Sequence, residues 1–221
     1  MATRASGALA EQFDDIEQQH LSATFGMWVF LVTEVMLFGG MFTAYASYRL
    51  LYPEGFAEGS RHMDLMLGGI NTAVLTVSSL TMALSVHAAR TGDRRTLIGF
   101  LGATILLGLV FLAIKAIEYW QHYHEQLVPG LRFSFEGPLA KQVELFFLFY
   151  FIMTGIHALH LTIGVGVVSV LLILSWRGQF APEAQDPVEV TGLYWHFVDI
   201  VWIFLLPLLY LFGLGGGATT S

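Results

Sequence analysis

The amino-acid sequence predicts an all-α, polytopic membrane protein, a bundle of five transmembrane helices. Of the 221 residues, 55% are hydrophobic and only 12% are charged, and the mean hydropathy is +0.65. A soluble domain carries about a quarter of its residues charged, so this chain has about half of the usual load. Five long apolar segments each exceed the roughly 20 residues that cross a bilayer as a helix. These observations exclude a soluble enzyme and a disordered regulator, and the net charge of −7 makes a nucleic-acid partner unfavourable.

The first three spans follow a polar tail. Residues 1–24 contain several acidic side chains and no apolar run, so the first span is expected over 25–48. The second span, over 65–89, is rich in Ser and Thr, which suit hydrogen bonds between neighbouring helices. The third is expected over 97–119. Continuous apolar runs of this length exclude barrel strands, and only helices satisfy their own backbone in lipid.

The last two spans differ in length. The fourth, over 143–176, would be about 50 Å long as one helix, so it is expected to tilt or to project from the bilayer. The fifth is expected over 193–214. We therefore expect one transmembrane domain over 25–214, preceded by the polar, cytoplasmic tail 1–24 and followed by a flexible tail over 215–221.

Arginines in the short loops predict the orientation of the chain. Arg90, Arg94 and Arg95 cluster in one tight loop on the side that holds the N-terminus. Because cytoplasmic loops are enriched in Lys and Arg, the N-terminus is expected in the cytoplasm and the C-terminus outside. Three aromatic side chains are expected to mark the membrane surface on the side of the N-terminus: Trp28, Trp176 and Trp195.

Ionisable side chains inside the expected spans are the candidate functional residues, because each costs a few kcal/mol in lipid. Glu34 lies near the middle of the first span, so it must be protonated, paired or hydrated. A proton or headgroup contact and a structural hydrogen bond to a neighbouring helix are both open for it. Lys115 and Glu118 are three residues apart on one helix face, and we expect them to form a structural ion pair.

Histidines form a second group of candidates. His157 and His160, spaced i,i+3, are expected to project from one face of the fourth span, and His196 and Asp199 have the same spacing in the fifth, where they could bond each other. A metal or haem site would need ligands from other helices at the same depth, and Glu34 alone could join the first pair. We therefore predict no catalytic, cofactor-binding or metal residues. The proton-linked or buried polar candidates are Glu34, His157, His160, His196 and Asp199.

Four motifs in these spans resemble those of subunit III of the haem-copper oxidases. They are Thr-Glu-Val-Met-Leu-Phe at 33–38, Lys-Ala-Ile-Glu-Tyr at 115–119, Thr-Gly-Ile-His-Ala-Leu-His at 154–160 and Tyr-Trp-His-Phe-Val-Asp-Ile-Val-Trp at 194–202. Their order and span assignments match the five-helix bacterial form of cytochrome c oxidase subunit III over nearly the whole chain. Glu34 falls on the family's buried glutamate.

The resemblance implies a non-catalytic subunit that supports subunit I of a respiratory terminal oxidase in aerobic electron transport and proton uptake. Haem and copper are then held by partner subunits, and no cofactor by this chain. The implied partners are subunit I, subunit II, other small membrane subunits and membrane lipids. The complex could also belong to a respiratory supercomplex, and no nucleic-acid partner is expected. The implied location is the bacterial plasma membrane, with bound phospholipids. Candidate lipid contacts are Trp28, Glu34, Arg177 and Trp195.

Several alternatives remain open at the level of the sequence. The stretches 150–155 and 206–210 look like a branch of the family associated with nitric oxide reductase. Related five-helix subunits also accompany quinol oxidases and supercomplexes with alternative complex III. Outside the family, the intramembrane acids and histidines are compatible with a proton channel or transporter, or with a membrane cytochrome b. The sequence shows no inverted repeat, which argues against a transporter.

Overall fold

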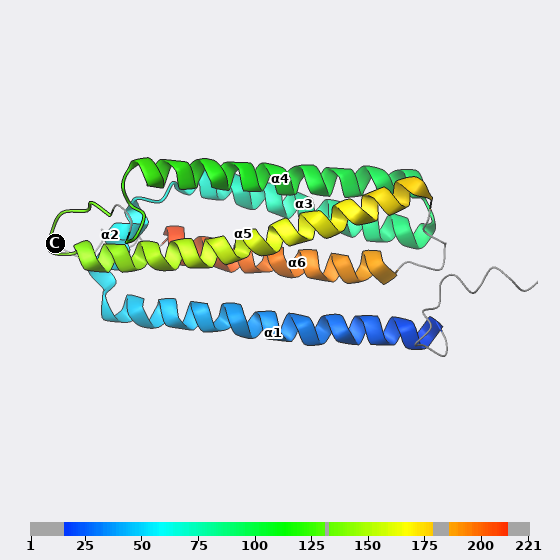
Figure 1. Cartoon of the computed structure of the whole chain (residues 1–221), viewed down its shortest axis with the longest axis horizontal. Coiled ribbons are helices and arrows are strands. Elements are labelled where there is room, and N and C mark those ends of the chain that lie inside the picture. The colour runs from blue at the N-terminus through cyan, green and yellow to red at the C-terminus, as the bar shows by residue number, and fades with distance from the viewer. Residues whose placement is uncertain (1–15, 131–132, 179–185, 212–221) are drawn as a thin grey trace, which may run out of the picture.

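The computed structural model describes residues 16–130, 133–178 and 186–211, and most of them are helical (Figure 1). The elements are α1 (Ile16–Leu51), α2 (Pro53–Arg61), α3 (Leu65–Thr91), α4 (Arg94–His124), α5 (Ala140–Arg177), α6 (Asp186–Leu206) and a π-helical turn, η2 (Pro207–Leu211). Within these ranges, five helices are long and apolar enough to cross a membrane, the last being α6 continued by η2. The predicted all-α, five-span membrane class is confirmed.

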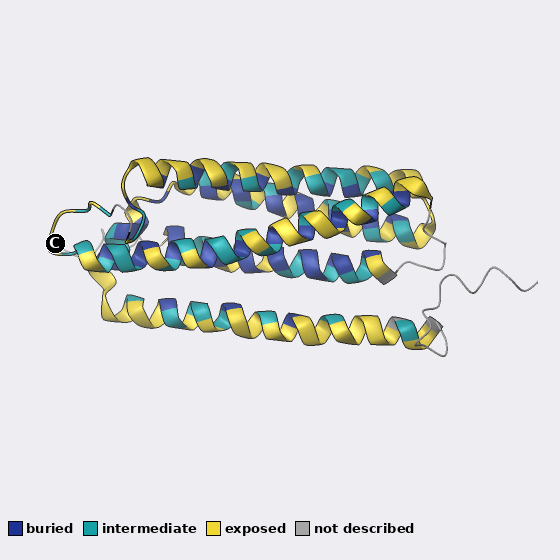
Figure 2. Ribbon diagram, viewed as in Figure 1, coloured by how far each residue is buried: buried dark blue, intermediate teal, exposed yellow. Residues whose placement is uncertain are grey.

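Four of the long helices form the body of the bundle, and α1 lies along one side of it. Buried residues concentrate on α3, α4, α5 and α6, whereas most of the surface of α1 is exposed (Figure 2). The buried hydrophobic side chains of α1 are Leu31, Phe38 and Tyr45, spaced by seven residues, so a single stripe of this helix faces the bundle. Its remaining apolar surface is suited to lipid or to another membrane subunit.

Helix boundaries differ from the expected spans mainly at the two ends of the chain. α1 begins at Ile16, so helix extends into the expected tail 1–24, and α6 begins at Asp186, seven residues before the expected start of the fifth span. Residues 1–15 and the expected flexible tail 215–221 lie outside the described residues. α2 was not expected, because nine polar and glycine-rich residues carry no hydropathy signal. It is held by Phe56, which is buried among aromatic rings of α1 and α5.

At the arginine-rich turn, a glycine ends α3 and an aspartate begins α4. Gly92, in the left-handed conformation (φ 73°), ends α3, and the carboxylate of Asp93 accepts hydrogen bonds from the backbone N–H groups of Arg95 and Thr96 at the start of α4. The hydroxyl of Thr96 also donates to Asp93, and this bond holds the pKa of Asp93 below its ordinary value. α3 and α4 therefore form a tight antiparallel hairpin.

Candidate functional site

Glu34 and His160 form a hydrogen-bonded pair between α1 and α5. His160 Nε2 lies 3.0 Å from Glu34 Oε2, and each side chain is only about one-seventh exposed (13% and 14%). The other ring nitrogen, Nδ1, lies 2.8 Å from the carbonyl oxygen of Ile156. A carbonyl only accepts, so Nδ1 carries a proton, and a second proton lies between Nε2 and Oε2. The pair is an imidazolium with a carboxylate, or an imidazole with a carboxylic acid, and it is electrically neutral in both forms.

The Glu34–His160 bond is expected to fasten α1 to the bundle. Glu34→Leu leaves His160 Nε2 without its partner in a largely dry site, and we expect a loss of about 1–3 kcal/mol in the stability of α1 packing. Glu34→Gln keeps the bond, because the amide NH₂ can donate to the neutral imidazole. The measurement is the rate of disulfide crosslinking between cysteines introduced on α1 and α6, which is expected to change in Glu34→Leu but not in Glu34→Gln. Equal rates in the two variants would show that the bond does not hold α1.

His157 does not share a site with His160. Its side chain is buried, and its ring packs between those of Phe111 and Trp202, with centroid distances of 5.6 and 5.1 Å. In the described part of the chain, neither ring nitrogen of His157 has a hydrogen-bond partner. The i,i+3 spacing brings the two histidines near one another along α5, but one points to α4 and α6 and the other to α1. Glu34 consequently joins only one of them, and no cluster of three or more potential metal ligands exists among the described residues.

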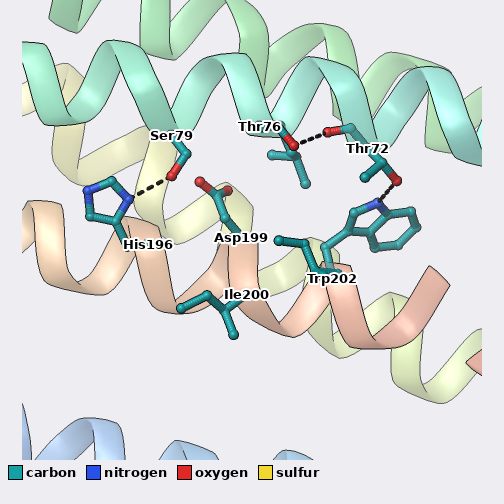
Figure 3. Close-up of a pocket in the computed structure, with 9 residues that line it drawn as sticks. Thr72, Thr76, Ser79, His196, Asp199, Ile200 and Trp202 are labelled. Carbon is teal, nitrogen blue, oxygen red and sulfur yellow. Dashed lines mark hydrogen bonds between the residues drawn. The ribbon is translucent and has the colours of Figure 1, made fainter. Parts of the chain in front are cut away.

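The expected bond between His196 and Asp199 is absent, and this prediction is wrong. His196 Nδ1 instead lies 2.7 Å from the hydroxyl oxygen of Ser79 on α3. Asp199 also points toward α3 (Figure 3), but neither of its carboxylate oxygens makes a hydrogen bond within the described residues. The imidazole of His196 is therefore bonded to the hydroxyl-rich face of α3 and not to its i,i+3 neighbour.

Lys115 and Glu118 form an ion pair of 2.9 Å that belongs to a larger buried cluster. Their side chains are only 5% and 1% exposed, so neither reaches the membrane surface. Lys115 Nζ donates to the hydroxyl of Tyr210 at 2.7 Å, and the Tyr150 hydroxyl donates to Glu118 Oε1 at 2.8 Å. The hydroxyl of Tyr210 donates to the same carboxylate oxygen. Sequence reasoning missed both tyrosines, although each lies in a stretch singled out as family-like, 150–155 and 206–210.

Trp195 is not at a membrane surface, so it cannot be the lipid contact that was expected. Its side chain is fully buried, and Nε1 donates to the Ser78 hydroxyl at 3.1 Å. Its ring fills the space above two glycines: a Cβ added to Gly108 or Gly164 would lie 3.0 or 3.2 Å from it. The other expected lipid contacts stay predictions, since Glu34 is partly exposed and Trp28 and Arg177 are exposed.

The hydroxyls of α3 bond neighbouring helices along its length. Besides Ser78 and Ser79, Thr72 accepts a hydrogen bond of 3.0 Å from Trp202 Nε1. Thr81 and Thr104 join α3 to α4 through their hydroxyls, 2.8 Å apart. Several polar side chains of the spans therefore hold helices together, whereas the side chains of Asn71, His157 and Asp199 are buried with no hydrogen-bond partner among the described residues. Such an arrangement is typical of a rigid, multi-span helical membrane subunit.

Comparison with known proteins identifies the family of this subunit. The model of the family "Cytochrome c oxidase subunit III" matches residues 14–214. The cytochrome c oxidase subunit 3 of Synechocystis is 37% identical over 193 residues, which cover 85% of this chain and 74% of that protein. The quinol oxidase subunit 3 of Bacillus spizizenii is 30% identical over 86% of this chain and 87% of its own length, and the cytochrome bo(3) ubiquinol oxidase subunit 3 of Pseudomonas aeruginosa is 30% identical over 87% and 86%. The chain belongs to the cytochrome c oxidase subunit III family.

Proposed function

We propose that this chain is the third subunit of a respiratory haem-copper terminal oxidase, with no redox centre of its own. It lies against subunit I, and it sustains proton uptake and turnover by the subunit that holds the haems and copper. The observation that carries this proposal is the family match over 14–214, which includes all five spans. Several of the buried polar groups bond neighbouring helices, as Lys115 and Glu118 do with Tyr210 and Tyr150, which supports a structural role for them.

The electron donor of the proposed complex is either cytochrome c or a quinol. The relatives include subunits named for cytochrome c oxidases and subunits named for quinol oxidases. The higher identity to the Synechocystis protein, 37% against 30%, favours a cytochrome c oxidase, with a quinol oxidase as the second candidate. A nitric oxide reductase and a supercomplex with alternative complex III are further outcomes of the experiment below.

We place the chain in the bacterial plasma membrane with its N-terminus in the cytoplasm. The arginine cluster Arg90, Arg94 and Arg95 lies at the same end of the bundle as the start of α1 (Figure 1), and a cytoplasmic position for it follows the positive-inside rule. The exposed apolar surface of α1 is suited to subunit I, to subunit II or to bound phospholipid. Trp28 and Arg177 are candidate headgroup contacts there.

Purification of the tagged chain from its native membranes in mild detergent tests the proposed function. We expect a subunit I that bears haem to co-purify, together with a subunit II whose domain reveals the donor. Complexes depleted of this chain are expected to reduce oxygen at first and then to lose activity over repeated turnover, which a time course of oxygen consumption measures. Isolation in a stable, haem-free complex with unrelated partners would contradict the proposal.

A further inference from the structure

A groove runs between α3 and α6 from the arginine end of the bundle toward its middle. It consists of two cavities of about 310 and 240 Å³ that share His196 as a wall. The outer cavity is bounded by Arg90 and Glu189, whose side chains form an exposed ion pair of 2.7 Å. The inner cavity contains Asp199, which Figure 3 shows directed at α3 between Ser79 and Thr76. His196 therefore stands between the surface ion pair and the buried carboxyl.

The sequence lines this groove with one continuous face from each helix. On α3, six lining positions are spaced by three or four residues, which keeps them on one side of a helix: 72, 76, 79, 83, 86 and 90. Leu75 also lines the inner cavity. On α6, the polar lining positions 189, 196 and 199 are spaced by seven and three residues, which also keeps them on one face of the helix. Hydroxyl groups lie at the inner end and charged groups at the outer end, so polar side chains extend along the groove from the surface into the membrane.

Asp199 lies at the middle of the last membrane-spanning segment. It is the central residue of the 25-residue span Pro187–Leu211, and it lies about 15 Å along the helix axis from Glu189. The residue is 4% exposed. A charged carboxylate at this depth is expensive, and a neutral one still needs hydrogen-bond partners.

The chain supplies no such partner from the described residues. Ser79 adjoins the carboxyl, and its hydroxyl lies 2.7 Å from His196 Nδ1, where either group can donate. Neither Asp199 oxygen makes a hydrogen bond within the described residues. The hydroxyl of Thr76 donates to the backbone carbonyl of Thr72 at 2.8 Å, so the Thr76 proton is used there. The cavity beside Asp199 offers the space through which a further hydrogen-bond partner can reach it.

The titratable side chains of the neighbouring helices have other contacts. Those of the groove itself are His196, bonded to Ser79, and the Arg90–Glu189 pair. Those on the helices around α6 are Glu34 and His160, which bond each other, Lys115, which bonds Glu118, and His157, which packs between aromatic rings. None of these contacts includes Asp199.

We propose that the groove between α3 and α6 is a water inlet, and that Asp199 is a proton-binding site supplied through it from the Arg90–Glu189 surface. Water fits both requirements of the site. A single water needs about 15 Å³ of accessible cavity and two to four polar partners, and the inner cavity has far more space and offers Asp199, Ser79 and His196. A hydronium ion arriving at the carboxylate transfers one proton to Oδ1 or Oδ2 and leaves as water, and the reverse step returns the proton. This inference does not depend on the proposed oxidase function.

Cysteine reactivity tests the inlet directly, because the natural chain has no cysteine. Two pairs of neighbouring positions on α3 are matched in depth: in each pair one residue lines the groove and the other is exposed outside it. The variants are Thr76→Cys with Val77→Cys as its control, and Ala83→Cys with Leu84→Cys. Thiolate is the reactive form and requires water. In native membranes carrying the full complex, a membrane-impermeant cationic methanethiosulfonate is added from the Arg90 side and this chain is read by mass spectrometry.

We expect both groove cysteines to be modified about tenfold or more faster than their controls, since only they are hydrated. Equal, slow modification of all four would overturn the inlet, as when a lipid chain or a partner helix fills the groove. The proton site has its own readout, the infrared carbonyl band of a protonated carboxyl that is lost in Asp199→Asn. This band is expected to titrate and to shift in D₂O. A band that does neither would overturn the assignment of Asp199.

Discussion

Glu118→Leu is expected to destabilise the folded chain by about 3–5 kcal/mol, because it removes one partner of a buried ion pair. The substitution leaves the Lys115 ammonium group, whose side chain is 5% exposed, without a counter-charge. It also takes away the acceptor of the Tyr150 and Tyr210 hydroxyls. The measurement is denaturant-induced unfolding of the purified complex, followed by protease susceptibility of this chain.

The double variant Lys115→Met/Glu118→Leu separates the cost of an orphaned charge from the value of the pair. Replacement of a whole buried ion pair by apolar groups of similar size is often close to neutral. We therefore expect the double variant to recover most of the stability that Glu118→Leu loses, and a double-mutant cycle gives the coupling.

An exposed pair in the same chain supplies the control. Glu58 and Arg61 have the same i,i+3 spacing and the same 2.9 Å separation, but their side chains are 32% and 53% exposed. Glu58→Leu is expected to cost less than about 1 kcal/mol, because water and salt screen such a pair. If Glu118→Leu cost no more than Glu58→Leu, the buried cluster would not stabilise the bundle.

This cluster also marks how far sequence reasoning reaches. The Lys115–Glu118 pair could be predicted because both residues lie on one helix, whose geometry is known in advance. Tyr210 lies 95 residues away from Lys115, and its place in the cluster depends on how α4 packs with η2. The five spans were predictable for a related reason: the length and apolarity of each segment are local properties that the bilayer selects.

The position of Trp195 along its helix was predicted wrongly from the sequence. Trp195 was expected at the surface because it lies near the start of the expected span 193–214. α6 instead begins at Asp186, which puts Trp195 about 13 Å inside the helix. His196 also lies farther inside the helix than expected, and its imidazole bonds the Ser79 hydroxyl of α3. The start of a helix and the start of its apolar run are separate quantities.

Trp195→Ala is expected to destabilise the bundle by about 3–5 kcal/mol, the usual range for truncating a large buried aromatic side chain. The side chain is fully buried, so its removal leaves a cavity between α4 and α5. It also leaves the Ser78 hydroxyl without the donor at 3.1 Å. Thermal unfolding of the purified complex measures the loss. Trp176→Ala is the control, since Trp176 is 74% exposed and its truncation is expected to stay within about 0.5 kcal/mol.

The glycines under this ring give the reciprocal test. A Cβ at Gly108 would lie 2.9 Å from Val165 Cγ2 and 3.0 Å from Trp195 Cη2, so Gly108→Ala overpacks the site and is expected to cost about 1–3 kcal/mol. Gly99→Ala on the same helix meets no atom within 4 Å and is expected to leave stability unchanged or slightly raised. The same crowding predicts that Trp195→Phe, which shortens the ring, reduces the penalty of Gly108→Ala in the double variant. Strictly additive losses would mean that the clash with Val165 of α5, and not the Trp195 ring, causes the penalty of Gly108→Ala.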